Sequence, residues 1–209
     1  ARVYRLAGGK DSALLSLKKW RFSKTRSALY RARSWLIENW PLKGRSVLRH
    51  YYIRKCAEAK KSIVIVTPYF IPHRWLMQAL EHAARRGVQI EVVLPEKTDV
   101  WIVTFANFVF ARMIADYIRF LFVPEMMHAK VLLVDDREGL IGSNNIDAQS
   151  FDINLEASVV FQRKDMIGNL KKILEQWKKN AKPFEKLSFP WKWYHSILAF
   201  FVRLIQPIL

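Results

Sequence analysis

The chain has 209 residues, and about half of them are apolar, which suffices for one sizeable hydrophobic core and excludes a largely disordered chain. Lys and Arg number 35 against 18 Asp and Glu, so the formal net charge is +17. Such an excess indicates an anionic partner, which could be nucleic acid, a phosphorylated substrate or an acidic membrane surface. The charge alone does not distinguish these partners.

Two features bear on the cellular context of the chain. The single cysteine, Cys56, cannot form an intrachain disulfide, and we expect its thiol to lie on the buried face of a helix in a reducing compartment. No N-terminal run has the charged, apolar and small-residue order of a signal peptide, and the first residue is Ala1. We therefore expect the chain to be a piece of a longer polypeptide.

Residues 1–45 form the first predicted region, a basic N-terminal segment or linker with little regular pattern. From Lys18 to Arg33 it contains no acidic residue, and aromatic side chains stand between the basic ones. Aromatic rings among cations suit a phospholipid interface or a nucleic-acid backbone, and they also suit a solvated helix with a few aromatic residues facing a core. These alternatives stay open at the level of the sequence.

Regular structure is expected from Ser46 onward. The β-branched run at 62–70 is typical of a strand buried on both faces, whereas Leu76, Leu80 and Ala83 recur at helical spacing before Gly87 in the stop position. The same criteria predict a helix at 46–61, a strand at 88–94, a helix at 99–116 and a strand at 117–124. A strand, a helix and a strand in succession usually form a right-handed crossover between parallel strands.

The alternation continues toward the C-terminus. We expect strands at 129–135, 139–143 and 154–161, followed by an amphipathic helix at 164–179. The pattern predicts an α/β fold, with a mixed, largely parallel sheet flanked by helices on both faces. Residues 46–182 form this second predicted region.

Residues 183–209 form the third predicted region. Apolar side chains nearly encircle the stretch from Ile197 to Leu209, and tryptophan, tyrosine and lysine gather just before it. Because a membrane span requires about 20 apolar residues, an amphipathic anchor lying in the membrane plane fits this stretch better. The alternative is a helix packed onto the core of the domain itself.

Polar residues that packing does not require gather on the strands between 128 and 156. His128 and Lys130 alternate along one strand and so project from the same face, with Asp135 at the far end of that strand. Together the set supplies an imidazole, a fixed cation, neutral donors and a carboxylate that can orient the imidazole. Its members are His128, Lys130, Asp135, Ser143, Asn145 and Glu156.

This set resembles the signature of the phospholipase D superfamily, which is H-x-K, four residues and D, followed by G-S-x-N and N-x-E. The matching positions are His128, Lys130, Asp135, Gly142, Ser143, Asn145, Asn154 and Glu156. The resemblance extends from about Val47 to Phe161, and this stretch is similar to the second catalytic half of bacterial cardiolipin synthases. It implies that the second predicted region, residues 46–182, is a phospholipase D-like catalytic half-domain. Gln149 departs from the pattern, because many members of the superfamily have arginine there.

The resemblance implies phosphohistidine chemistry that uses no metal and no other cofactor. It implies catalytic roles for His128, Lys130, Asp135 and Glu156, and phosphate binding by Lys130, Ser143 and Asn145. We expect Glu156 to accept a hydrogen bond from the His128 ring. Asp135 stands several strand positions away, so we expect it to support the site structurally.

The chemistry of this superfamily needs two such sets facing one phosphate, and the chain has one. None of the other four histidines is followed by lysine two positions later. The second set would come from a homodimer partner or from a missing N-terminal half, and the likeness to a second half favours the latter.

The implied function is phosphatidyl transfer between membrane phospholipids, as in a cardiolipin synthase. The expected partners are anionic phospholipid and the membrane surface, and the expected location is the cytoplasmic face of a bacterial inner membrane. The alternative is a phospholipase D-like nuclease that acts as a homodimer on nucleic acid.

Overall fold

The computed structural model describes residues 33–40, 46–187 and 199–200. The elements from Leu36 onward belong to one unit of the chain. Most of the predicted basic segment, up to residue 32, and most of the predicted apolar tail, from residue 188, lie outside the described residues. Both therefore stay predictions.

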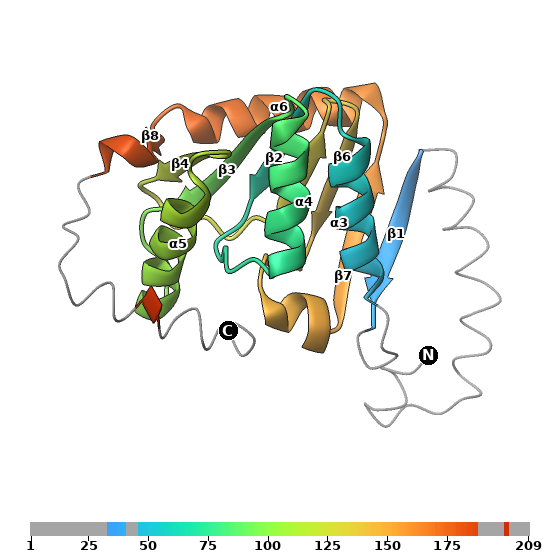
Figure 1. Cartoon of the computed structure of the whole chain (residues 1–209). Helices are drawn as coiled ribbons and strands as arrows, with labels where there is room; N and C mark the ends of the chain where they lie inside the picture. The colour runs from blue at the N-terminus through green and yellow to red at the C-terminus, as the bar shows by residue number, and fades with distance from the viewer. Residues whose placement is uncertain (1–32, 41–45, 188–198, 201–209) are drawn as a thin grey trace. The chain divides into compact units, whose positions relative to one another are not determined.

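An eight-stranded mixed sheet organises the described part of the chain (Figure 1). Its spatial order is β1-β7-β6-β5-β2-β3-β4-β8. The strands are β1 (Ser34–Asn39), β2 (Ser62–Val66), β3 (Gln89–Pro95), β4 (Arg119–Val123), β5 (Val131–Val134), β6 (Glu138–Gly142), β7 (Glu156–Phe161) and β8 (Lys182–Pro183). The prediction of an α/β fold with a mixed sheet is confirmed.

The expectation that this sheet is largely parallel is wrong. Among the described pairings, β2–β3 and β3–β4 are parallel, whereas β2–β5, β5–β6, β6–β7 and β4–β8 are antiparallel. Parallel neighbours need a crossover of about a dozen residues or more, which α4 (Arg74–Arg85) and α5 (Trp101–Ile114) supply. Only residues 135–137 join β5 to β6, so these two strands form a hairpin. An apolar run does not encode strand direction, and the connections decide it.

Helices cover both faces of the sheet, as predicted (Figure 1). Helices α3 (Val47–Glu58), α4 and α5 build the larger core on one face. Helix α6 (Lys164–Lys178) builds the smaller core on the other, where Leu170 and Leu174 join Leu133 and Phe161. Burying each such side chain stabilises the fold by about 1.5–3 kcal/mol relative to leaving it exposed.

Signals at the helix ends act as the sequence predicts. Ser46 is the N-cap of α3, because its hydroxyl accepts the Arg49 N–H at 3.1 Å. Gly87 follows α4 with φ +88°, a conformation that glycine adopts without strain. Cys56 is buried in α3, and burial raises the pKa of its thiol to about 12, so the thiol is part of the core.

Strand β1 and a π-helix are among the elements not expected from the sequence. Strand β1 lies within the range predicted as an N-terminal segment, and it joins the sheet beside β7. A π-helix at Gln149–Ile153 interrupts the connection between β6 and β7. Neither has a periodic apolar pattern long enough to be read from the sequence.

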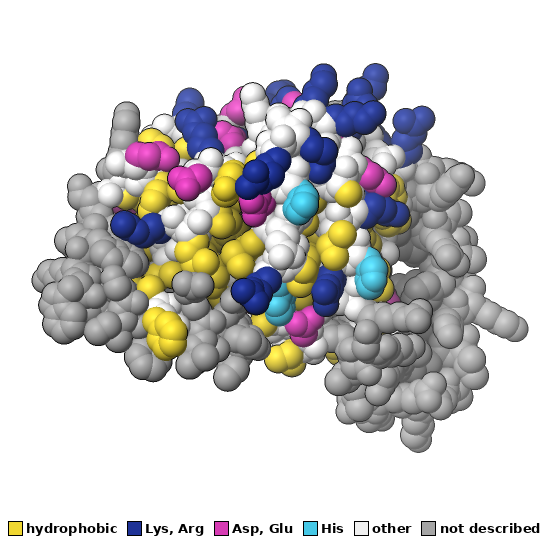
Figure 2. All heavy atoms as spheres, in the orientation of Figure 1, with side chains coloured by type: hydrophobic (Ala, Val, Ile, Leu, Met, Phe, Trp, Pro, Cys, Tyr) yellow, Lys and Arg dark blue, Asp and Glu magenta, His cyan; other side chains and the backbone are white. Residues whose placement is uncertain are grey.

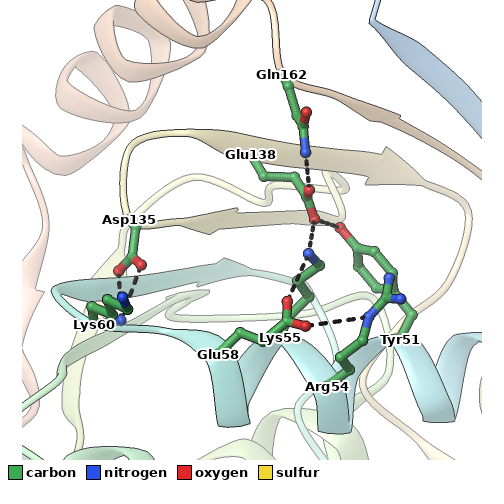
Figure 3. Close-up of polar contacts among 8 residues, drawn as sticks. All are labelled: Tyr51, Arg54, Lys55, Glu58, Lys60, Asp135, Glu138 and Gln162. Carbon is green, nitrogen blue, oxygen red and sulfur yellow. Dashed lines mark hydrogen bonds and ion pairs between the residues drawn. The ribbon is translucent and has the colours of Figure 1, made fainter. Parts of the chain in front are cut away.

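A buried carboxylate ties α3 to the β5–β6 hairpin (Figure 3). Glu138 accepts hydrogen bonds from Tyr51 Oη at 2.6 Å and Gln162 Nε2 at 2.6 Å, and Lys55 Nζ lies 2.9 Å away. Burial pushes the pKa of Glu138 upward, but these three donors outweigh it and hold the pKa below its ordinary value. The carboxylate is therefore ionised and fully partnered inside the fold.

The charge of the described residues is dispersed on the face seen in Figure 2. Lys and Arg side chains are densest along the upper edge of this view, and Asp and Glu side chains stand among them. Several form exposed ion pairs, such as Arg85 with Glu81 and Arg54 with Glu58. Exposed pairs of this kind contribute little to stability.

Candidate active site

The site lies at the edge of the sheet where β2 and β3 end and β5 begins. Val66, the last residue of β2, is paired with Val93 of β3 and with Val131, the first residue of β5. The loops that follow β2 and β3 therefore meet the segment that precedes β5. A sheet edge where the strand order changes direction in this way is a common ligand site in α/β proteins.

His128 and Lys130 come directly before β5 at this edge. The imidazole of His128 is exposed, whereas Lys130 is buried with 7% of its surface accessible. Lys130 Nζ donates to the His128 carbonyl oxygen at 2.9 Å, which fixes the lysine beside the histidine. Burial lowers the pKa of Lys130, while the carboxylates of Glu156, Asp147 and Asp99 act in the opposite direction.

Ser143 and Glu156 form the second part of the site. The Ser143 hydroxyl donates a short hydrogen bond to Glu156 Oε2 and accepts the Ala157 N–H at 3.1 Å. Glu156 was expected to accept from the His128 ring; within the described residues its partner is Ser143 instead. The carboxylate still stands in the field of Lys130.

The close packing of β6 against β7 explains why the residue before Ser143 in the signature is a glycine, Gly142. A Cβ at this position would lie 2.0 Å from Ser158 Oγ and 2.6 Å from Ser158 Cβ. Only glycine lets β6 approach β7 this closely, and that approach brings Ser143 to Glu156. The glycine therefore sets the spacing of the site.

The loop after β6 holds Asn145 in place. The Asn145 N–H donates to Ser150 Oγ at 3.0 Å, and the Ser150 N–H donates to Asp147 Oδ1 at 2.7 Å. Burial raises the pKa of Asp147, although hydrogen bonds from Ser150 and from the Asn145 side chain lower it. Asn145 Oδ1 is buried and has no hydrogen-bond partner among the described residues.

A residue of β1 supports this loop from outside the expected half-domain. Asn39 is fully buried, and its amide donates to the carbonyl oxygens of Ser150 at 3.3 Å and Phe151 at 3.2 Å. Its oxygen accepts from Ser46 Oγ at 3.0 Å. A single asparagine therefore joins β1, the start of α3 and the π-helix, and no sequence pattern marks it for that role.

Asp135 lies at the other end of β5 and does not join the site. Its carboxylate accepts three backbone N–H groups, from Lys61 at 2.7 Å and from Lys60 and Ser62 at 3.0 Å each. Burial raises the pKa of Asp135, but these bonds prevail and lower it. Asp135 and Asp136 have φ of 52° and 55°, and Arg137 N–H donates to Val134 O at 3.0 Å, as in a type I′ hairpin turn. The expected structural role of Asp135 accounts for all of these contacts.

Three further polar residues at the site edge were not expected from the sequence. Asp147 lies in the G-S-x-N loop, Tyr69 in the loop after β2, and Asp99 in the loop after β3. Tyr69 Oη donates to Asp99 Oδ1 at 2.7 Å. The signal that could have identified Tyr69 and Asp99 is their position just after two parallel strands, where side chains of a site commonly gather.

A hollow among the described residues lies away from this site. A cavity of about 640 Å³ lies where β2, β3 and β4 begin, opposite the edge that carries His128, and its lining includes Arg85, Asp116, Tyr117 and Arg119. Its two arginines are already paired with Glu81 and Glu91. Among the described residues, no group of three His, Cys, Asp or Glu side chains is placed to hold a metal ion.

A histidine and a buried lysine beside a serine–glutamate pair, at one edge of a mixed α/β sheet, define a protein of the phospholipase D superfamily. The chain belongs, within it, to the family described as "Cardiolipin synthase, PLD-like domain", whose model matches residues 52–178. Gln149, where many members have arginine, is exposed at the start of the π-helix.

Curated relatives are cardiolipin synthases by name. The chain is 33% identical over 139 residues to the probable cardiolipin synthase YwiE of Bacillus subtilis, covering 66% of this chain and 27% of that protein. It is 30% identical over 181 residues to cardiolipin synthase 1 of Bacillus anthracis, covering 83% and 35%. The chain thus spans about a quarter to a third of the length of these relatives.

Solved structures share the fold. The phospholipase D family member Nuc from Salmonella typhimurium superposes with a TM-score of 0.60 at 20% identity, covering 72% of this chain and 97% of Nuc. The phosphatidylserine synthase of Haemophilus influenzae superposes with a TM-score of 0.67 at 16% identity, covering 84% and 48%. No helix in the described parts of the chain is both long and apolar enough to span a membrane.

Proposed function

We propose that this chain is one catalytic half of a cardiolipin synthase-like phosphatidyltransferase, which acts on the phosphodiester of membrane phospholipids. The observation that carries the proposal is the convergence of His128, Lys130, Ser143 and Glu156 at one sheet edge in a chain of the cardiolipin synthase family. The family supplies the substrate class, and the geometry supplies the groups that such a reaction needs.

The reaction requires a second histidine from another HKD set, which is the H-x-K and D part of the signature formed here by His128, Lys130 and Asp135. In the first step one histidine nitrogen attacks phosphorus, the bond from phosphorus to the leaving alcohol breaks, and the other histidine gives that alcohol its proton. In the second step an acceptor hydroxyl loses its proton to the second histidine and attacks phosphorus, and the phosphorus–nitrogen bond breaks. His128 can take either role, since its imidazole is exposed at the site edge.

The remaining residues hold the phosphate and the loop around it. Lys130 is a buried cation fixed beside His128, so it stabilises negative charge on the phosphoryl oxygens as that charge develops. Asn145 is positioned by Ser150 to bind a phosphate oxygen through its amide. Ser143 and Glu156 hold each other, and Glu156 becomes available to an imidazolium at position 128 if Ser143 turns to the phosphate.

An apolar row beside the site supports docking of a second phospholipase D-like half. The row consists of neighbours across β5, β6 and β7, which are Val131, Ile141 and Val159. It lies on the face of the sheet that α6 covers nearer to the hairpin end of β5. Ile141 and Val159 are nevertheless 44% and 36% exposed, whereas Val131 is buried and joins the row to its neighbour Lys130. A half that covers this row would bring its own histidine toward the same phosphate.

The docking surface can be tested by one pair of substitutions. Ile141→Asp should weaken assembly with the second half and reduce activity with it, whereas Ile53→Asp on the opposite face of the sheet, at 38% exposure, should not. Sedimentation measures the assembly. An active symmetric dimer of this chain would identify the second half as a copy of itself, and an inactive monomer would indicate a different polypeptide segment.

The proposed surroundings are an anionic phospholipid surface at the cytoplasmic face of a bacterial inner membrane. The net charge of +17 supports association with anionic lipid. The basic segment before residue 33 and the apolar stretch after residue 196 are the proposed contacts with that surface. Deleting residues 190–209 should abolish flotation of the chain with anionic liposomes, and unchanged flotation would exclude this anchor.

The decisive experiment compares lipid and nucleic acid as substrates. The chain, assembled with its second half, is incubated with labelled phosphatidylglycerol and separately with DNA, and the products are resolved. The proposal expects a cardiolipin-type product that is absent with His128→Ala. DNA nicking that depends on His128, without any lipid product, would instead establish the nuclease alternative. The single motif and the high positive charge are both compatible with that alternative.

A further inference from the structure

Tyr69 and Asp99 lie on the two loops that follow the parallel strands β2 and β3, at the edge that carries Lys130. The Tyr69 carbonyl oxygen accepts the Ile146 N–H at 3.1 Å, so Tyr69 lies against the loop between Asn145 and Asp147. The charge of Asp99 acts on Lys130, which places this carboxylate within electrostatic reach of the lysine. Both residues therefore border the proposed phosphate site.

Threonines hold the backbone of the two loops that carry these side chains. The hydroxyl of Thr67 donates to the Tyr69 carbonyl oxygen at 2.9 Å and accepts the Tyr69 N–H at 3.4 Å. In the other loop, Thr98 N–H donates to Thr104 Oγ1 at 2.9 Å, and Thr98 Oγ1 donates to the Val100 carbonyl oxygen at 2.7 Å. The conformation of the two loops, and with it the contact between Tyr69 and Asp99, is therefore stabilised by bonds that do not involve the catalytic residues.

The pair offers hydrogen-bond acceptors. Tyr69 Oη donates a hydrogen bond to Asp99 Oδ1. The lone pairs of Tyr69 Oη and the second carboxylate oxygen of Asp99 therefore remain to accept hydrogen bonds. Burial and the neighbouring Asp99 raise the pKa of Tyr69 to about 12, so Tyr69 stays a neutral hydroxyl. Asp99 is exposed and therefore accessible to a ligand.

A carboxylate beside Lys130 repels phosphate oxygens and attracts hydroxyl groups. The edge thus has a cationic side, formed by Lys130 with His128, and an acceptor side, formed by Tyr69 with Asp99. A ligand that satisfies both sides is a phosphodiester approached by an alcohol with further free hydroxyl groups, as in a glycerol headgroup.

We propose that Tyr69 and Asp99 bind the free hydroxyl groups of the polyol that accepts the phosphatidyl group, beside the phosphate held by Lys130. This assignment rests on the proposed transferase function. The pair positions the acceptor, while His128 and its counterpart carry out the chemistry. It thereby selects a polyol over water and over alcohols with a single hydroxyl group.

The test uses Tyr69→Phe and Asp99→Asn in the chain assembled with its second half. Phosphatidyl transfer is measured against the concentration of glycerol, of phosphatidylglycerol and of propan-1-ol, together with hydrolysis of the donor to phosphatidic acid. The matched controls are Tyr117→Phe and Asp116→Asn, which stand at the opposite edge of the sheet.

Each variant should raise the apparent KM for glycerol and for phosphatidylglycerol by about tenfold, the factor expected for one lost hydrogen bond to a charged or polar group. The product ratio should move toward phosphatidic acid, and the KM for propan-1-ol should not change. The two control variants should match the unmodified chain in all of these measurements.

Other outcomes overturn the assignment in distinguishable ways. If the unmodified chain forms lipid product and the two variants behave like the controls, the acceptor site is refuted while the transferase function stands. An effect with phosphatidylglycerol but not with glycerol would place the pair against the rest of the lipid. If the unmodified chain forms no lipid product at all, the proposed function and this assignment both fail.

Discussion

The two ends of strand β5 carry the two ends of one sequence signature, and they differ in how their polar groups are satisfied. At the hairpin end, Asp135 accepts three backbone N–H groups and Glu138 has three side-chain donors. At the site end, the His128 ring is exposed and Asn145 Oδ1 has no partner among the described residues. Groups that stabilise the fold are already paired, whereas groups that serve a ligand keep bonding capacity in reserve.

The largest effect is expected from His128→Ala at the site end. Loss of the imidazole should reduce phosphatidyl transfer by about a thousandfold or more, because both steps need a histidine on each side of the phosphate. The free energy of unfolding should change little, since the side chain is exposed. Product analysis and urea unfolding measure the two quantities, and activity near the unmodified level would place the chemistry elsewhere.

Lys130→Met should separate activity from stability at the same end. Transfer should fall by about a hundredfold because a fixed charge on the phosphoryl oxygens is lost. The free energy of unfolding should stay equal or rise, since burial lowers the pKa of Lys130 and so opposes its charged form. A marked loss of stability in urea would show that the lysine is mainly a structural cation.

Asp135→Ala, at the hairpin end, should reduce stability and leave activity unchanged. Three backbone N–H groups lose a charged acceptor, so the free energy of unfolding should fall by about 2–3 kcal/mol. Asp136→Asn is the matched control in the same turn, because the partner of the Asp136 carboxylate among the described residues is Lys171, in an exposed ion pair. Transfer per folded molecule, measured well below the unfolding midpoint, should be retained. A loss of activity without a loss of stability would indicate that Asp135 has a catalytic role.

Acid should unfold the hairpin end through the same carboxylates. The pKa values of Asp135 and Glu138 are lowered in the folded chain, so their contribution is present in full above about pH 4, the ordinary range of carboxyl groups. It is lost as the pH falls below that range through the lowered values, because protonation then costs the folded state its hydrogen bonds. Glu138→Gln should make this decline shallower, and Glu58→Gln, whose exposed carboxylate also contacts Lys55, should not. The free energy of unfolding is measured by urea titration at pH 6 and at pH 3. An equal loss between these pH values in Glu138→Gln and in the unmodified chain would contradict this expectation.

The elements predicted from periodicity agree with the structure where a buried face imposes the period. The predicted helix at 46–61 is α3 (Val47–Glu58), and the predicted strand at 88–94 is β3 (Gln89–Pro95). Strand β1 was missed because it is short and lies between segments without a clear pattern. The parallel pairing of β2 with β3 was predicted correctly from the helix between them. The antiparallel pairings of β5, β6 and β7 were not predicted, because an apolar run does not encode the direction of its strand.

The candidate site divides in a similar way. Its motif residues were named from their spacing, and the structure brings His128 and Lys130 together, and Ser143 to Glu156. Asn39 and Tyr69 could not be identified in that way, because each approaches the site from a distant part of the chain.

The sequence by itself determined the residue types, their spacing and the presence of one HKD set. The expected alternation along a strand does not describe His128 and Lys130, because both lie just before β5 and only Lys130 is buried. Only the tertiary structure decided which end of β5 faces a ligand. That choice depends on which loops the sheet order brings to each edge: backbone N–H groups of the α3–β2 loop reach Asp135, and the loops after β2 and β3 reach Lys130. Contacts between segments far apart in the chain supply that information, and local sequence does not contain it.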